Sequence, residues 1–384
     1  MVIKKHDNHD QLSMDDFESE VETAENGNAV GPEQTDGVAG AEKVIHSKKR
    51  SEPTRVQWEA LFDIAKRIRA IEPWSFMWDM DFITLLLPGT DQPLYCSVLG
   101  NAGLCYGINI YRGDSALSAL MCMIENDNEF STVYNEQDCL MLSFGDREEL
   151  TAKDRALLKE LDLRFRGRHE WIYFRTMDPG YVPWYIDSNH ADVLIQALQN
   201  IYMAIICLME NKLSVDFEKG QTLVRFYSET DDMWCNAIGK LPVTSEDDRT
   251  LVITNDGLIA DIKKLKRSKI KLEFDVTCFP VNVCENRGDR PSIPLFLLLA
   301  DKTSGIIIDQ KTVGNNERVE SAVLDMLIRH FMSYGRPLSI NIRDKRTGMY
   351  IEDLCNRIDV KLIMGKEMPA INETIRYLTK AMSR

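Results

Sequence analysis

Glycines are the residues whose spacing in this sequence first suggests chemistry. The stretch "SVLGNAGLCYGINIYRG" contains Gly100, Gly103 and Gly107, and glycine-rich turns bind phosphate where their backbone amides open a helix. Its flanks, "LYCSVLG" and "LCYGINIY", are instead rich in aromatic and β-branched residues, which favour strands. The spacing GxxGxxxG also departs from the dinucleotide-binding pattern GxGxxG. We therefore predict a hairpin whose loop glycines adopt positive φ, with Gly107 allowing a close backbone approach.

Thiols and imidazoles form no recognisable ligand pattern. The nine cysteines are scattered without a CxxC pair, and three of the six histidines precede residue 54. No Cys/His group has zinc-site spacing, and no histidine completes a nucleophile pattern. The first residues do not read as a secretory signal, so we expect free thiols in a reducing cytoplasm. We expect no resident cofactor.

Two aromatic segments, "EPWSFMWDMD" and "GYVPWYID", suggest the binding of an apolar ligand. Trp74, Trp78 and Trp184 are the candidate residues of such a pocket, because aromatic side chains present large apolar areas. Packing in the protein core is the alternative for all three tryptophans. An exposed apolar patch on this part of the chain would favour binding over core packing.

Charge is divided unevenly along the 384 residues. The net charge is −14, but residues 249–384 hold 23 Lys and Arg against 17 Asp and Glu, a balance of +6. The residues before them hold the remaining 23 basic and 43 acidic side chains, a balance of −20. This shift indicates two domains with different surfaces, and +6 is too small to indicate nucleic-acid binding. No apolar run reaches the roughly 18–20 residues of a membrane helix.

Composition divides the chain into a tail and two domains. Residues 1–53 are acidic and nearly free of large apolar side chains, so we expect a disordered tail. Residues 54–240 mix helical and strand patterns without strict alternation, which predicts an α+β domain with antiparallel strands. The acidic, proline-containing stretch "KLPVTSEDDR" is the predicted linker. Residues 249–384 then form the second domain.

The second domain has a distinct order of elements. A short strand and a basic helix are predicted over 250–268, and "KIKLEFDVTCFPV" then alternates as a strand does. "IPLFLLLADKTSGIIIDQKTV" predicts a strand, a tight turn and a returning strand. Helix, strand, helix, strand and helix follow, the last with Pro369 at its start. This order predicts an α/β domain with a mixed sheet.

Several motifs resemble a family of uncharacterised bacterial proteins with two domains of unknown function. "YCSVLGNAGLCYGINIY" and "VPWYID" are similar to the first domain of that family, and "IPLFLLLADKTSG" and "GRPLSINIRD" to the second. The resemblance extends from residue 54 to the end of the chain. It implies a bacterial cytoplasmic protein and a two-domain layout, without an assigned activity.

The element order of the second domain is also similar to the ribonuclease H-like fold of nucleases and transposases. Those enzymes hold two divalent metals between carboxylates, and the metals activate water and stabilise the leaving oxygen. Matched by position, the resemblance implies Asp275, Asp344 and Glu373 as ligands of Mg²⁺ or Mn²⁺. Asp301, at the end of the second strand, is a rival to Asp275. Arg343 and its basic neighbours crowd Asp344, which suits phosphate better than a metal.

These acids have an ordinary alternative as turn, cap and surface residues. We therefore predict a non-catalytic cytoplasmic protein, not embedded in a membrane, that binds a partner protein or a small ligand through its first domain. The alternative function is a divalent-metal-dependent nuclease acting on nucleic acid through the acids named above. The two functions differ in geometry, because carboxylates that share two metals converge within about 4–8 Å.

Overall fold

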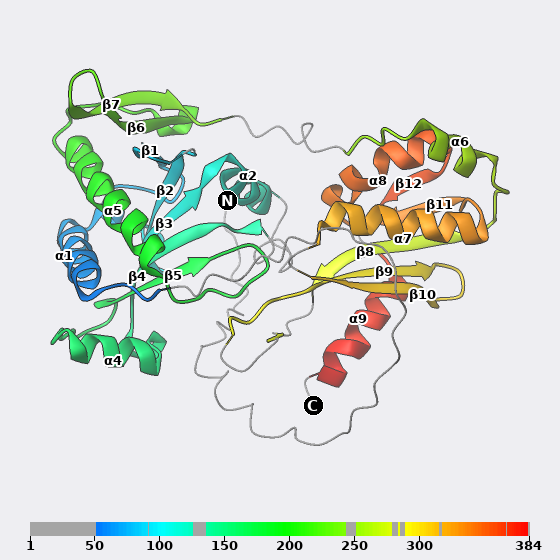
Figure 1. Cartoon of the computed structure of the whole chain (residues 1–384), viewed down its shortest axis with the longest axis horizontal. Helices are drawn as coiled ribbons and strands as arrows, with labels where there is room; N and C mark the ends of the chain where they lie inside the picture. Colours follow the sequence, from blue (N-terminus) through cyan, green and yellow to red (C-terminus); the bar gives the residue numbers. More distant parts are fainter. Residues whose placement is uncertain are drawn as a thin grey trace, which may run out of the picture.

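The computed structural model describes most of the chain from Ser51 onward and shows two domains (Figure 1). Residues 1–50 of the predicted tail (1–53) and residues 243–249 of the predicted linker lie outside the described residues. The described ranges are 51–90, 92–125, 136–242, 251–278, 283–284, 289–314, 317–365 and 367–382.

The first domain is built on a seven-stranded sheet in the order β5-β4-β3-β2-β1-β6-β7. Neighbouring strands are antiparallel except β1 and β6, which run parallel. This arrangement confirms the predicted α+β class. The strands are β1 (Ile83–Leu86), β2 (Leu94–Leu99), β3 (Tyr106–Arg112), β4 (Cys139–Gly145), β5 (Trp171–Met177), β6 (Gln221–Ser228) and β7 (Met233–Lys240). The helices are α1 (Arg55–Ile71), α2 (Gly113–Glu125), α4 (Ala152–Glu160) and α5 (Ser188–Met209).

The glycine stretch forms the predicted hairpin between β2 and β3, which pair antiparallel along their length. In the loop, Gly100 and Gly103 have φ of 138° and 75°, which side chains larger than glycine rarely adopt. A Cβ on Gly107 would lie 2.3 Å from the carbonyl oxygen of Leu142 on β4. The close approach of β3 to β4 therefore requires glycine. The loop glycines Gly100 and Gly103 turn between two strands and do not open a helix, since α2 begins only after β3, at Gly113.

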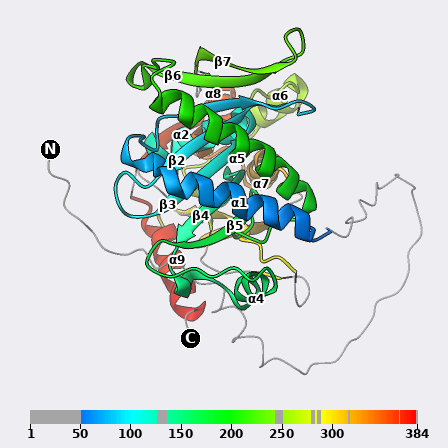
Figure 2. The ribbon, with the colours of Figure 1, turned by 90° about the vertical axis from the view of Figure 1, so that its left-hand side faces the viewer.

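Two helices cover one face of this sheet. Figure 2 shows α1 and α5 crossing it side by side, and their apolar stripes enter the main core of the domain. The shorter α2 packs on the other face against Tyr95 and Tyr111. Among the described residues, α5 is the helix that is long and apolar enough to cross a membrane. Its apolar stripe, which includes Leu194 and Ile201, is buried in the core, as in a central helix of a globular domain.

The second domain has a five-stranded sheet in the order β10-β9-β8-β11-β12. β9 is antiparallel to both of its neighbours, whereas β8, β11 and β12 run parallel. Counted along the domain this is the order 3-2-1-4-5, and it confirms the predicted ribonuclease H-like mixed sheet. The strands are β8 (Lys271–Cys278), β9 (Leu295–Asp301), β10 (Ile307–Val313), β11 (Ser339–Ile342) and β12 (Lys361–Met364). The helices are α6 (Asp256–Lys264), α7 (Val319–Tyr334), α8 (Lys345–Arg357) and α9 (Pro369–Met382).

The two faces of this sheet are covered unequally. α6, α7 and α8 bury their apolar side chains against Leu272 and Phe274 on β8 and their neighbours. On the opposite face α9 packs against Leu298 and Ala300 of β9. The face under α9 also carries the acids of β8, so it positions the predicted metal ligands.

A short segment of the second domain binds the first domain. The Ile293 amide donates to the Gly180 carbonyl at 2.9 Å, and the Val182 amide donates to the Pro291 carbonyl at 3.3 Å. The guanidinium of Arg290 also forms an ion pair with Asp178. The segment between β8 and β9 therefore ties the two domains together.

One predicted element is wrong. The strand expected at the start of 250–268 is absent from the described residues 251–255, which form no strand, and α6 begins directly at Asp256. The Leu251 amide instead donates to the Met349 carbonyl at the C-terminal domain's α8. The Ile253 amide likewise donates to Asp353 Oδ2 on α8 at 2.9 Å, and the Ile253 side chain enters the core while Val252 is 66% exposed. The run "LVI" is therefore held by α8 and not by a neighbouring strand.

Candidate functional site

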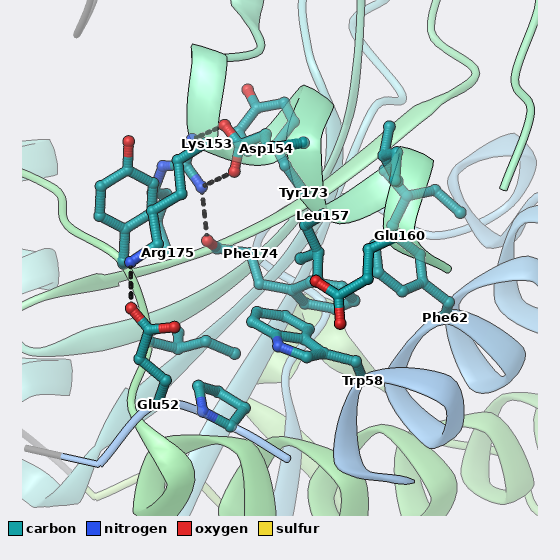
Figure 3. A pocket seen from close by; sticks show the side chains of 16 residues that line it. Glu52, Trp58, Phe62, Lys153, Asp154, Leu157, Glu160, Tyr173, Phe174 and Arg175 are labelled. Carbon is teal, nitrogen blue, oxygen red and sulfur yellow. Dashed lines mark hydrogen bonds and ion pairs between the residues drawn. The ribbon is translucent and has the colours of Figure 1, made fainter. Parts of the chain in front are cut away.

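A pocket of about 180 Å³ lies along β5, the edge strand of the first-domain sheet, between α1 and α4. Figure 3 shows its side chains converging from these three elements. The lining combines aromatic and aliphatic walls with several charged groups. It consists of Glu52, Pro53, Trp58, Phe62, Lys153, Asp154, Ala156, Leu157, Leu158, Glu160, Ile172, Tyr173, Phe174, Arg175, Tyr185 and Ile186.

Capping boxes set where the two helices of the pocket begin. Thr54 and Gln57 exchange side-chain and backbone hydrogen bonds at the start of α1, and Thr151 and Asp154 do the same at the start of α4. The second box has the sequence Thr–x–x–Asp, in which Asp replaces the usual Glu or Gln. Each box fixes the first turn of its helix, and the first turn of α4 carries Lys153 and Asp154 of the pocket.

Arg175 on β5 is the most enclosed charge in the pocket, with 5% of its surface exposed. Its Nη1 and Nη2 donate to the two carboxylate oxygens of Asp154 at 3.0 and 2.5 Å. Nη1 also donates to the Phe174 carbonyl at 2.8 Å. The guanidinium lies 5.0 Å from the ring centroids of both Tyr173 and Tyr185. Arg175 is thus held by protein groups on several sides and acts as part of the pocket wall.

Lys153 is the more accessible cation. Its Nζ donates to Glu52 Oε1 at 2.7 Å, but the two side chains are 52% and 76% exposed. The amine also lies 4.6 Å from the ring centroid of Tyr185, whose hydroxyl donates to Thr151 Oγ1 at 3.0 Å. Exposed ion pairs contribute little stability, so an anion that enters the pocket can displace Glu52 from Lys153 at small cost.

The apolar wall is made of aromatic rings from α1 and β5. Phe62 and Phe174 meet edge to face with ring centroids 5.5 Å apart, and Trp58 lies 6.1 Å from Phe174. Leu157 on α4 faces the same space (Figure 3). Such a wall favours a flat apolar group, because stacked and edge-on ring contacts add to the area that is buried.

The predicted tryptophans lie elsewhere than in this lining. Trp74 is 7% exposed and packs between Tyr106 and Phe144 with centroids 5.2 and 5.4 Å away. Trp78 is 59% exposed. Trp184 forms a backbone bridge to Thr176 beside the pocket, while the next residue, Tyr185, lines it. The segment "GYVPWYID" therefore lines the pocket with Tyr185 and not with Trp184, the residue predicted from the sequence.

Asp275 lies on β8 under α9 and is 1% exposed. Arg343, which follows β11, donates from Nε to Oδ1 at 3.0 Å and places Nη2 2.9 Å from Oδ2. Arg343 Nη2 also donates to Asn372 Oδ1 on α9 at 3.0 Å. The sequence suggested that Arg343 acts on Asp344, its chain neighbour, but its guanidinium instead neutralises the buried Asp275.

The other predicted acids have local roles. Asp344 caps α8, where it accepts hydrogen bonds from the Thr347 amide at 2.8 Å and the Thr347 hydroxyl at 2.7 Å. Asp301 accepts from the Thr303 amide and the Ser304 hydroxyl, both at 2.9 Å, and the Thr303 amide lowers the pKa of that carboxyl. Glu373 is exposed on α9.

These acids do not gather into one site. Among the residues that the structure describes, no group of three or more His, Cys, Asp and Glu side chains is placed to hold a metal ion. Glu273, two residues before Asp275 on β8, is fully buried and accepts from the Ala370 and Ile371 amides at 3.1 and 3.2 Å. This carboxylate thus binds the N-terminus of α9, where the helix dipole favours a negative charge.

Two family models match parts of the chain, and solved structures show only distant similarity to it. Residues 58–225 match a domain of unknown function, DUF7309, and residues 258–379 match another, DUF6930. None of the curated proteins compared with the chain matches it. The crystal structure of the catalytic core domain of BIV integrase is 13% identical and covers 30% of this chain and 70% of its own, with a TM-score of 0.23.

A second solved structure has a similarly low identity and TM-score. It is the simian T-cell lymphotropic virus intasome in complex with PP2A regulatory subunit B56 gamma, which is 15% identical at a TM-score of 0.21. The match covers 32% of this chain and 45% of that chain. The two family matches, and not these distant structures, show that the chain carries two distinct domains of unknown function.

Proposed function

We propose that this chain, which joins a DUF7309 domain to a DUF6930 domain, is a non-catalytic protein that binds a small aromatic carboxylic acid. The observation that carries the proposal is the composition of the pocket along β5. Aromatic rings from Trp58, Phe62 and Phe174 form one wall, and the amine of Lys153 lies at the same cavity. A ligand with a flat apolar body and one carboxylate satisfies both.

Size supports the same class of ligand. A dry cavity of about 150 Å³ accommodates benzene, so the pocket of about 180 Å³ accommodates a single small ring system. The ring would contact the Trp58 and Phe62 side while the carboxylate replaces Glu52 at Lys153. Arg175 would stay with Asp154, because a buried ion pair of this geometry is costly to open.

Binding of matched probes tests this proposal. The probes are phenylacetate and indole-3-acetate with their uncharged amides, measured by titration calorimetry and by ligand-observed NMR on the full chain. We expect the acids to bind more tightly than the amides, by about fivefold or more for one charge-assisted hydrogen bond. Lys153→Ala should remove this preference, whereas Lys159→Ala, on the same helix outside the pocket lining, should keep it.

Glu52→Gln gives the sharper result. Removing the internal competitor should raise the affinity for the acids and leave the affinity for the amides unchanged. If neither the native chain nor Glu52→Gln binds any acid at millimolar concentration, the pocket does not serve this class of ligand.

The alternative function, a metal-dependent nuclease at Asp275, Asp344 and Glu373, has weaker support. The guanidinium of Arg343 lies against Asp275, where that function needs a metal cation. Asp344 is engaged by Thr347 at the start of α8. Both contacts occupy acids that the nuclease would need as metal ligands, and so favour the binding function. The effect of Mg²⁺ on the melting temperature distinguishes the two functions.

A further inference from the structure

Among the described residues, no strand pairs with the outer edge of the strand at the other end of the first-domain sheet. β7 pairs with β6 and ends the sheet, far along the strand order from β5 and its pocket (Figure 1). The Leu241 amide donates to the Gly220 carbonyl of the β6 side. Along an antiparallel strand the backbone amides and carbonyls of successive residues point alternately to either side. Those of the odd-numbered residues of β7 therefore point toward β6. The amides and carbonyls of Trp234, Asn236 and Ile238 therefore face away from the sheet.

This edge lacks the features that protect most edge strands. Its eight residues contain one charge, Lys240, and no proline, and its register with β6 runs without a bulge. Met233 and Ile238 are 54% and 47% exposed. A long, regular and apolar edge strand is a template for pairing with another strand.

The sequence of β7 is complementary to itself in the antiparallel direction. Suppose that a two-fold axis at Asn236 relates two copies of β7. The outward-facing backbone amide and carbonyl of Asn236 in one copy then hydrogen-bond with those of Asn236 in the other. Trp234 of one copy then lies opposite Ile238 of the other, and an aromatic beside a β-branched residue is a favourable cross-strand pair. In the same register Lys240 lies opposite Asp232, the left-handed turn residue just before β7, whose carboxylate accepts from the Tyr227 hydroxyl of its own chain. Each end of the pairing thus brings a basic side chain near this acidic one.

The neighbouring registers lose this match. A shift by two residues places Trp234 opposite either Asn236 or Lys240, and Lys240 no longer opposes Asp232. Shifts by one residue are excluded, since they would set an outward-facing residue against an inward-facing one. One register therefore satisfies the backbone, the apolar side chains and the charges together.

We propose that β7 pairs antiparallel with β7 of a second copy of this chain, about a two-fold axis at Asn236. The two seven-stranded sheets then form one continuous sheet. The pocket along β5 is at the opposite edge of each sheet, so this pairing is independent of ligand binding.

Sedimentation equilibrium of the full chain tests the pairing first. We expect a concentration-dependent dimer, and Ile238→Pro should lower the association constant by about tenfold or more, because it removes an outward-facing amide. Ile238→Thr keeps the amide and the β-branched shape and should change the constant by less than about threefold. A chain that stays monomeric at several hundred micromolar, or a dimer unaffected by Ile238→Pro, overturns the proposal.

Charge reversal in separate chains tests the register. Lys240→Asp alone sets two acidic groups together at both ends of its homodimer, and Asp232→Lys alone sets two basic groups together. Each variant should self-associate about tenfold more weakly than the native chain, as expected when two exposed pairs change from attraction to repulsion. An equimolar mixture contains a heterodimer in which both ends match again.

The mixture should therefore regain native-like association, seen as a dimer peak in which the two variants, one carrying an affinity tag, elute together. Thermal unfolding of each variant as a monomer checks that the fold is kept. If the mixture associates no better than its components, the antiparallel register about Asn236 is wrong, whatever the native chain does.

Discussion

Arg343 and Asp275 form a two-point ion pair across the second-domain sheet, with Nε–Oδ1 and Nη2–Oδ2 distances of 3.0 and 2.9 Å. Asp275 is on the central strand β8, and Arg343 leaves the neighbouring β11. In the ribonuclease H-like arrangement this face of the sheet is where carboxylates would meet metals. Here a guanidinium supplies the positive charge that a buried carboxylate requires.

Replacing Arg343 by alanine should strongly destabilise the second domain. The change leaves Asp275, which is 1% exposed, without its cation, and breaking a buried ion pair from one side costs about 3–5 kcal/mol. Urea denaturation measures this loss. The double variant Asp275→Leu/Arg343→Met should recover most of it, since an apolar pair of similar size needs no charge compensation. Equal stability of Arg343→Ala and the native chain would show that the pair is not buried in solution.

Addition of Mg²⁺ or Mn²⁺ should leave the melting temperature of the native chain unchanged. A cation that binds only the folded state raises the melting temperature in proportion to the logarithm of its concentration, but Arg343 already compensates Asp275. Differential scanning fluorimetry with and without millimolar metal, after treatment with a chelator, measures the effect. A stabilisation that vanishes in Asp275→Asn, together with cleavage of DNA or RNA, would establish the nuclease instead.

Most of the fold follows from local patterns in the sequence. The alternation in "KIKLEFDVTCFPV" predicts β8 with Leu272 and Phe274 on its core face, and the flanks of Gly100 and Gly103 predict the β2–β3 hairpin. Both depend on residues that are close in the chain. The strand expected at the start of 250–268 fails because the Leu251 and Ile253 amides bond to α8 instead of to a neighbouring strand, a contact that the local sequence does not reveal.

The residues of the candidate site are harder to predict from the sequence than the fold. Trp58 and Phe62 lie one turn apart on α1, yet nothing in the local sequence shows that Arg175 and Tyr185 meet them beside α4. The pairing of Arg343 with Asp275 likewise depends on β11 lying next to β8. A basic residue directly after one predicted strand and an acid within the apolar first strand were the available signals, and they become decisive only when the strand order is known.

Acid should weaken the contact between the two domains. Burial alone would raise the pKa of Asp178, but the charges of Arg290 and Arg112 lower it to about 2. The ordinary value in an unfolded chain is about 3.9, so this group adds stability above pH ~4 and loses it as the pH falls toward 2. The expected contribution is about 2 kcal/mol.

Denaturation of the native chain and Asp178→Asn between pH 2 and 7 measures that contribution. The two free energies of unfolding should differ by a constant amount near neutral pH and converge near pH 2. Asp63→Asn, at an exposed position of α1, should run parallel to the native chain. A gap between the native chain and Asp178→Asn that persists unchanged to pH 2 would show that the Asp178 carboxylate does not titrate as the ion pairs require.

Gly107→Ala should destabilise the first domain through the spacing of its strands. The added Cβ would meet the Leu142 carbonyl oxygen at 2.3 Å, and that oxygen belongs to the backbone of β4, so β3 and β4 must separate. Forcing an extra methyl group into a packed site costs about 1–3 kcal/mol. Gly314→Ala, where a Cβ would meet nothing within 4 Å, should change the free energy of unfolding by less than about 0.5 kcal/mol. Equal effects of the two substitutions would mean that β3 and β4 are not in close backbone contact at Gly107.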